Sequence, residues 1–185
     1  MKKLSALALL AAFSSAPAYA HDVQAFYLQA EQNNIEIDGY GVSARFNASE
    51  KWVITGAYAQ AEEETTQLET TAASLGFEYL STSGNVTGVM GGEVSRAEVD
   101  STDSSSTSAS FYVGGQGKAF YVHAGVSLDQ DDSETDLFYR LGARFGADKK
   151  LFGLGLFFEL SGGAAANDNS SGVPFGTFAG LNYHF

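Results

Sequence analysis

Cysteine and proline are nearly missing from this sequence. It contains no cysteine, so disulfides contribute nothing to its stability, and only two of its 185 residues are proline. Proline interrupts the hydrogen-bond ladder of a sheet, whereas aromatic side chains suit strands, and the chain has nine tyrosines and 14 phenylalanines. The composition therefore favours a β protein.

Basic residues are also few. Ten Lys and Arg residues stand against 22 Asp and Glu residues, which gives a formal net charge of −12 at pH 7. Such a charge argues against binding to nucleic acid and against docking on an anionic surface through Lys or Arg. We therefore expect no nucleic-acid partner.

The apolar run near the N-terminus, residues 4–13, is too short to cross a membrane as a helix, which needs about 20 residues. It follows two lysines and precedes small residues around Tyr19, an order typical of a secretory signal. We expect residues 1–20 to be a signal peptide cleaved after Ala20, and residues 21–185 to form one domain. No cysteine lies near that site, which excludes a lipoprotein anchor.

After residue 20, apolar and polar positions alternate in runs of about nine to twelve residues, as expected of strands with two different faces. Short connections, such as 47–51, 81–85, 115–118 and 147–150, take turns with longer or more polar ones. Sequential antiparallel strands joined in this way form an up-and-down meander. The ten predicted strands are 22–30, 35–46, 52–61, 71–80, 86–98, 109–115, 119–128, 137–146, 151–161 and 173–185.

The alternation gives most strands one apolar and one polar face. In residues 137–145, Leu137, Leu141 and Phe145 share a face, and Arg140 and Arg144 lie on the other. Two folds fit this pattern. In a water-soluble sandwich the apolar faces point inward, and in a membrane barrel they point outward to lipid.

Three features favour the barrel. Tilted strands of about ten residues match the thickness of an outer membrane. Aromatic residues lie at strand ends beside the short turns, as in an interfacial girdle. Closure also removes the free sheet edges that hydrocarbon does not tolerate. We predict an all-β, closed, antiparallel up-and-down transmembrane β-barrel of about ten strands, with eight strands or a sandwich as alternatives.

The second predicted strand is less regular than the others. Ile35 and Ile37 are out of phase with Tyr40 and Val42. We expect either a β-bulge near Asp38 or a strand top that stands clear of the membrane.

The signal, the alternating strands, the two kinds of connection and the terminal "GLNYHF" resemble small outer-membrane β-barrels of Gram-negative bacteria, of the OmpX and OmpA transmembrane-domain type. The resemblance covers residues 21–185 as a pattern, without a long matching motif. It implies an outer-membrane location, short turns in the periplasm and longer loops outside the cell. It also implies a C-terminal signal for the barrel-assembly machinery, carried by Leu181, Tyr183 and Phe185.

A barrel places a set of charged residues in its interior, and buried charges must be paired. We expect a lumen charge network that largely plugs a narrow pore. A thin, porin-like polar passage for ions or small solutes is the alternative. The predicted network is Arg45, Glu78, Glu93, His123, Arg140, Arg144 and Glu159.

The longer connections are rich in acidic residues and contain no lysine. We expect them to keep an exposed rim hydrated, and the alternative is that divalent cations bridge their carboxylates to anionic lipopolysaccharide. The segment 129–136 is not an EF-hand, because it lacks the central glycine and the closing glutamate. The acidic residues are Glu31, Glu62, Glu63, Glu64, Glu69, Asp100, Asp103, Asp129, Asp131, Asp132, Glu134, Asp136 and Asp168.

No catalytic, cofactor-binding or metal-binding motif is evident. The three histidines are His21, His123 and His184, and none lies on a predicted outer loop where a barrel enzyme would need it. We expect a monomeric, non-enzymatic barrel with no cofactor and a structural or surface-interaction role in the cell envelope, in contact with membrane lipid.

Overall fold

The computed structural model describes residues 21–32, 35–64, 66–100, 104–130, 135–145, 153–165 and 175–184. The expected signal peptide lies outside these residues. The ten strands are β1 (His21–Gln32), β2 (Ile35–Asn47), β3 (Trp52–Glu63), β4 (Glu69–Ser83), β5 (Val86–Val99), β6 (Ser104–Gln116), β7 (Phe120–Asp129), β8 (Thr135–Phe145), β9 (Leu154–Ala165) and β10 (Phe175–His184). In the described part of the chain, no helix is long and apolar enough to cross a membrane, a finding that does not concern strands.

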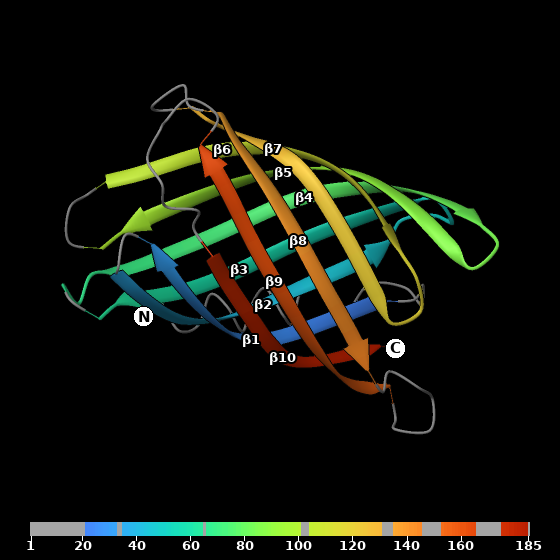
Figure 1. The fold of residues 1–185 in the computed structure, drawn as a ribbon, viewed down its shortest axis with the longest axis horizontal. Coiled ribbons are helices and arrows are strands. Elements are labelled where there is room, and N and C mark those ends of the chain that lie inside the picture. Colours follow the sequence, from blue (N-terminus) through green and yellow to red (C-terminus); the bar gives the residue numbers. More distant parts are fainter. Residues whose placement is uncertain are drawn as a thin grey trace.

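Each strand pairs antiparallel with its neighbours in the sequence, and β1 pairs with β10 to close a barrel (Figure 1). The closing ladder runs from Asp22 opposite His184 to Glu31 opposite Phe175. Closure gives the backbone groups of both terminal strands a partner, which is the condition for strands to lie in hydrocarbon. The predicted fold class is confirmed with ten strands, so the eight-strand count and the sandwich are excluded.

The sequence alternation becomes an outer and an inner face. On β8, Leu137, Leu141 and Phe145 point outward and are exposed, whereas Arg140 and Arg144 point into the barrel. The same order on the other strands leaves an apolar band around the outside of the barrel. Such a surface is stable in lipid but not in water, because large contiguous apolar patches are rare on soluble monomers.

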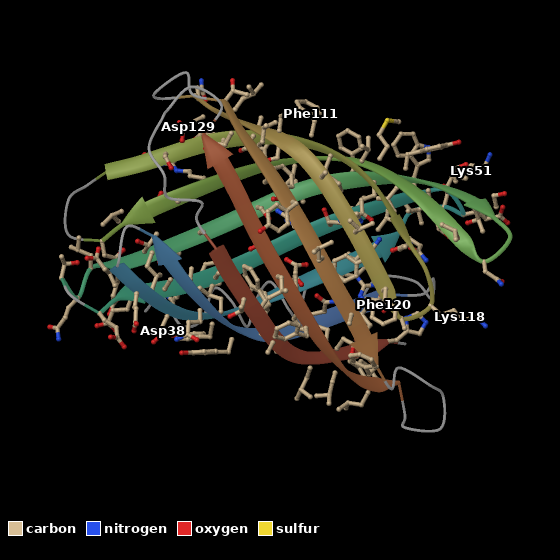
Figure 2. The ribbon with its side chains drawn as sticks, viewed as in Figure 1. Asp38, Lys51, Phe111, Lys118, Phe120 and Asp129 are labelled. Atoms are coloured by element: carbon tan, nitrogen blue, oxygen red, sulfur yellow. The ribbon has the colours of Figure 1, made fainter. Side chains whose placement is uncertain are left out.

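The two ends of the barrel differ in their connections and charges. Short connections at residues 48–51, 84–85 and 117–119 define what we call the short-turn end, and the opposite end is the loop end. In the β4–β5 hairpin a two-residue turn places Gly84 at φ 63°, a conformation that glycine adopts without strain. Figure 2 shows Lys51 and Lys118 at the short-turn end, and Asp38 and Asp129 toward the loop end.

Aromatic rings gather on the outer face at the short-turn end. The ring of Trp52 lies 5.2 Å from that of Tyr79 and 6.1 Å from that of Phe77, between centroids. Phe120 and Phe145 form a second edge-to-face pair at 6.4 Å. Aromatic side chains are enriched where hydrocarbon meets the polar headgroups, so these pairs mark one boundary of the apolar band.

The expected β-bulge near Asp38 is wrong. The ladders of β2 with β1 and with β3 continue without interruption through Asp38 and Gly39. On the outer face there, the Tyr27 hydroxyl donates to Asp38 Oδ1 at 2.7 Å, and the Tyr40 hydroxyl donates to Gln60 Oε1 at 2.8 Å. Polar side chains on the outer face need water and not lipid. The other alternative therefore remains, in which this part of β2 is a strand top that lies beyond the apolar band.

Candidate functional site

The barrel interior gathers most of the buried polar groups among the described residues. Glu78, on β4, is only 4% exposed, and His123, Ser110 and Asn182 are buried as well. All four occupy inward positions of the strand alternation. Their partners come from other strands, so the interior is the candidate functional site.

A first cluster joins three strands around the Glu78 carboxylate. The Arg45 guanidinium, from β2, forms an ion pair with it, and the Tyr112 hydroxyl, from β6, donates to it at 3.0 Å. The guanidinium also reaches Gln116 Oε1 on β6 at 3.5 Å. Strands β2 and β6 are separated by three strands in the sheet, so these side chains cross the interior rather than lie along its wall.

A second cluster surrounds Glu159 on β9. The Tyr121 hydroxyl, from β7, donates to the Glu159 carboxylate, and the Arg144 guanidinium lies 4.8 Å from the centre of the Tyr121 ring. Strand β8 runs between β7 and β9, and Gly142 gives the Tyr121 ring room to cross it. A Cβ atom at Gly142 would collide with that ring.

Arg140 pairs with another member of the predicted charge network. Its Nη2 lies 3.7 Å from Oε1 of Glu93 on β5. Glu78 and Glu159 also accept hydrogen bonds from tyrosine hydroxyls, and the prediction included no tyrosine. The Arg140 guanidinium also lies 5.2 Å from the centre of the Phe138 ring.

His123 packs against aromatic rings. Its ring stacks on Tyr112 at 5.3 Å and lies 5.4 Å from the ring of Tyr121, between centroids. Its Nε2 has no hydrogen-bond partner. At the short-turn end, His184 Nδ1 lies 2.7 Å from Asp22 Oδ1.

Toward the loop end the inward side chains become small. Ser95 and Ser108 hydroxyls lie 2.7 Å apart, and Ser110 donates to Ser127 at 3.0 Å. The clusters around Glu78 and Glu159 thus lie in the short-turn half of the interior. At the rim of the loop end, the inward positions include Asp129 and Asp136. The other inward residues of the loop half include Ala57, Ala59, Ala61, Ala72, Ser74 and Ala97.

The predicted C-terminal signal lies partly outside the described residues. Leu181 and Tyr183 are on the outward face of β10, beside Ala25 and Val23 of β1. Phe185 is not described. Nothing in this geometry identifies a contact with another protein.

The predicted acidic rim is also only partly described. Residues 101–103, 131–134 and 166–174 lie outside the described segments, whereas Glu62, Glu64, Glu69 and Asp129 lie at the loop end. Within the described segments, no group of three or more His, Cys, Asp or Glu side chains is placed to hold a metal ion.

The closed ladder, the apolar exterior and the polar interior define the class of protein: a transmembrane β-barrel. No protein-family model matches the chain. No curated protein matches it significantly either.

Several solved barrel structures are similar in outline. Neisserial surface protein A is 14% identical, with 90% of this chain and 96% of that chain covered and a TM-score of 0.45. The β domain of the Bordetella autotransporter BrkA is 14% identical, with 89% and 98% covered and a TM-score of 0.48. The N-terminal β-barrel domain of Pseudomonas aeruginosa OprF is 12% identical, with 89% of this chain and 97% of that chain covered and a TM-score of 0.39. All three TM-scores are below 0.5.

Proposed function

We propose that the chain is a barrel of the outer membrane of a Gram-negative cell, exported by the expected signal peptide. The support is physical. Its strands are 10 to 15 residues long, enough to cross a bilayer when tilted, and its outward face is apolar. We place the short-turn end in the periplasm and the loop end outside the cell.

We further propose that the barrel is a monomer with a structural or surface-interaction role and that its interior is plugged. The observation that carries this proposal is the set of contacts across the interior. Arg45 on β2 reaches Gln116 on β6, and Arg140 on β8 reaches Glu93 on β5, across three and two strands. The contacts of Arg45 with Glu78 and of Tyr121 with Glu159 each span one strand. Side chains that meet across a ten-stranded barrel leave little free cross-section for a solute.

Planar-bilayer recording tests the plug. Pure refolded protein is expected to give no stable conductance steps of a single size. Arg45→Ala removes the guanidinium that joins β2 to β4 and β6, and it is expected to introduce such steps. Arg96→Ala, which changes an exposed outward residue, serves as the control and should remain silent. Regular steps from the unchanged protein would contradict the proposal.

A narrow, porin-like channel is the second candidate. It is favoured by the small inward residues of the loop half, which obstruct the interior less than the clusters near the short turns. In that case the unchanged protein itself conducts, and Arg45→Ala only enlarges its steps. The same recordings therefore separate the two candidates.

We propose lipopolysaccharide as a partner of the loop end, through divalent cations held by its carboxylates. The support is the separation of charge, with acidic residues at this end and Lys51 and Lys118 at the other. Calorimetry with Ca²⁺ should give weaker binding when Glu62, Glu64 and Glu69, which are exposed at the loop end, are changed to Gln. Equal binding by this variant would contradict the cation bridge and leave the acidic rim as a hydrated surface.

We propose that the barrel-assembly machinery recognises Leu181, Tyr183 and Phe185. The support is that Leu181 and Tyr183 share the outward face of β10, the strand that closes the barrel with β1. Phe185→Ala should slow assembly into vesicles that contain this machinery but leave unassisted refolding into detergent unchanged. Equal assembly rates would contradict the signal. We propose no catalytic activity or cofactor.

A further inference from the structure

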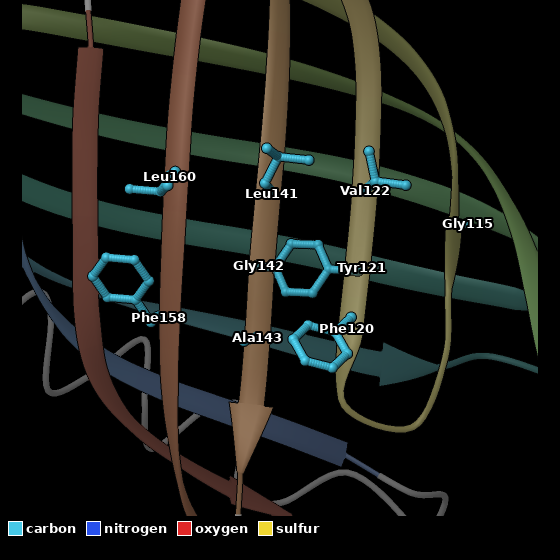
Figure 3. A pocket seen from close by; sticks show the side chains of 9 residues that line it. All are labelled: Gly115, Phe120, Tyr121, Val122, Leu141, Gly142, Ala143, Phe158 and Leu160. Carbon is cyan, nitrogen blue, oxygen red and sulfur yellow. The ribbon is translucent and has the colours of Figure 1, made fainter.

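An apolar groove interrupts the outer face of the barrel within the described strands. It lies across β7, β8 and β9, has a volume of about 400 Å³, and is lined by Phe120, Leu141, Phe158 and neighbouring apolar groups (Figure 3). This volume is within the 300 to 1,000 Å³ typical of sites for small ligands. The groove opens toward the surrounding medium, so in a bilayer it faces lipid.

The groove exists because small residues take the place of bulky ones on its floor. Ala143 lies outward between Phe120 and Phe158, and Gly115 lies outward at the edge of the groove, beside Val122. A Cβ atom at Gly115 would meet only atoms at 3.9 Å, so the space above it is open. A larger side chain could therefore be introduced at Gly115 without displacing the backbone.

A positive charge stands at one end of the groove. Lys118 is exposed in the turn between β6 and β7, two residues before Phe120, and Figure 2 shows both at the short-turn end. The turn is held by the Gly117 amide, which donates to the Phe120 carbonyl at 2.7 Å. A molecule bound in this groove would therefore contact apolar walls along the groove and a cation at one end of it.

We infer that the groove binds one acyl chain of a phospholipid from the leaflet at the short-turn end, with the lipid phosphate beside Lys118. This inference rests on the proposed membrane location. A phospholipid is apolar along its chains and anionic at its head, which matches the groove and the lysine together. A second copy of this barrel, inserted in the same direction, would bring Lys51 and Lys118 to the same level, where like charges repel.

Native mass spectrometry of the detergent-solubilised barrel, with added phosphatidylglycerol, tests the inference. The unchanged protein should retain one lipid per barrel. Gly115→Leu adds a bulky side chain at the β6 edge of the groove, beside Val122, and should lower retention by about tenfold, since several methylene groups lose their contacts. Lys118→Gln, in an exposed turn, should lower it by about fivefold, because one cation near the phosphate is lost.

Two matched controls complete the design. Ala25→Leu enlarges an exposed, outward residue of β1 far from the groove, and Lys51→Gln removes the charge of a different short turn. Both should retain lipid as the unchanged protein does. Equal retention by all five proteins would mean that lipid coats the barrel non-specifically, and it would overturn the inference. The inference would also be overturned if the unchanged protein were a dimer and Gly115→Leu abolished that dimer.

A gel of boiled and unboiled samples shows whether each variant is folded, independently of lipid retention. A folded barrel without the specific lipid contradicts only the present inference, whereas a chain that forms no barrel contradicts the proposed function. If Gly115→Leu fails to fold, Lys118→Gln decides the question by itself, because its side chain is exposed.

Discussion

At the scale of single residues, Glu78 depends on partners from two other strands. Its carboxylate is buried, and it accepts bonds from Arg45 on β2 and Tyr112 on β6. A buried charge that loses its partner keeps the cost of its removal from water. The stability of the barrel should therefore respond strongly to a change at Arg45 and weakly to changes at exposed ion pairs.

Arg45→Ala is expected to lower the free energy of unfolding by about 3 kcal/mol, because it leaves the Glu78 carboxylate without its cation. Urea titration of the barrel refolded into lipid vesicles measures this change. The control is Arg96→Ala: Arg96 Nε lies 3.1 Å from Glu98 Oε1 on an exposed surface, so its loss should cost less than about 1 kcal/mol. Equal effects of the two substitutions would contradict the role assigned to Glu78.

Gly142 is the residue that lets the Tyr121 ring cross strand β8. Gly142→Ala would place a methyl group against this ring and move the Tyr121 hydroxyl away from Glu159. We expect a loss of about 1 to 3 kcal/mol in the same titration, the usual cost of overpacking. Gly115→Ala, at an open outward position, should change stability by less than about 0.5 kcal/mol.

At the scale of the strand, the two faces of β9 have different surroundings. Leu154, Leu156 and Phe158 point outward, and Phe157 and Glu159 point inward. The ring of Phe157 lies 6.4 Å from that of Phe26 on β1, across the intervening β10. Each strand therefore contributes to two different surfaces, one in contact with hydrocarbon and one with polar side chains.

Leu75→Arg tests which solvent bathes the outer face. Leu75 is 63% exposed near the middle of β4, and an arginine near the bilayer midplane costs about 2 to 4 kcal/mol. We expect a loss of this size when the variant is titrated in lipid vesicles. Ser105→Arg, outward at the loop end of β6 and opposite Glu98, should cost about 0 to 1 kcal/mol. Equal costs would mean that no hydrocarbon surrounds Leu75.

At the scale of the whole molecule, the closed sheet joins the first strand to the last. Opening the barrel would expose two edges at once, and in hydrocarbon unpaired backbone groups cost several kcal/mol each. The barrel should therefore resist detergent as a unit.

A gel in sodium dodecyl sulfate measures this resistance. The unboiled, refolded protein is expected to migrate differently from the boiled protein, because the closed barrel stays folded until heated. A control sample kept in urea should migrate like the boiled one. Identical migration of the unboiled and boiled samples, or a chain that folds in plain buffer without any amphiphile, would contradict the barrel in lipid.

The sequence alone was sufficient for the order of the strands and their two faces, because side-chain direction in a strand follows from position: Leu137 and Leu141 had to share one face, and Arg140 the other. It did not give every strand end: the strand predicted at 109–115 runs from Ser104 to Gln116, because its serine-rich beginning has no apolar alternation. The local pattern gave a count of about ten, and only closure of the sheet excluded eight. The sequence could not assign Arg140 to Glu93, or Tyr112 to Glu78. Pairing across the interior depends on strand tilt and stagger, which only the closed sheet determines. The groove beside Phe120 likewise required neighbouring strands in register, since its floor joins residues that are distant in the chain.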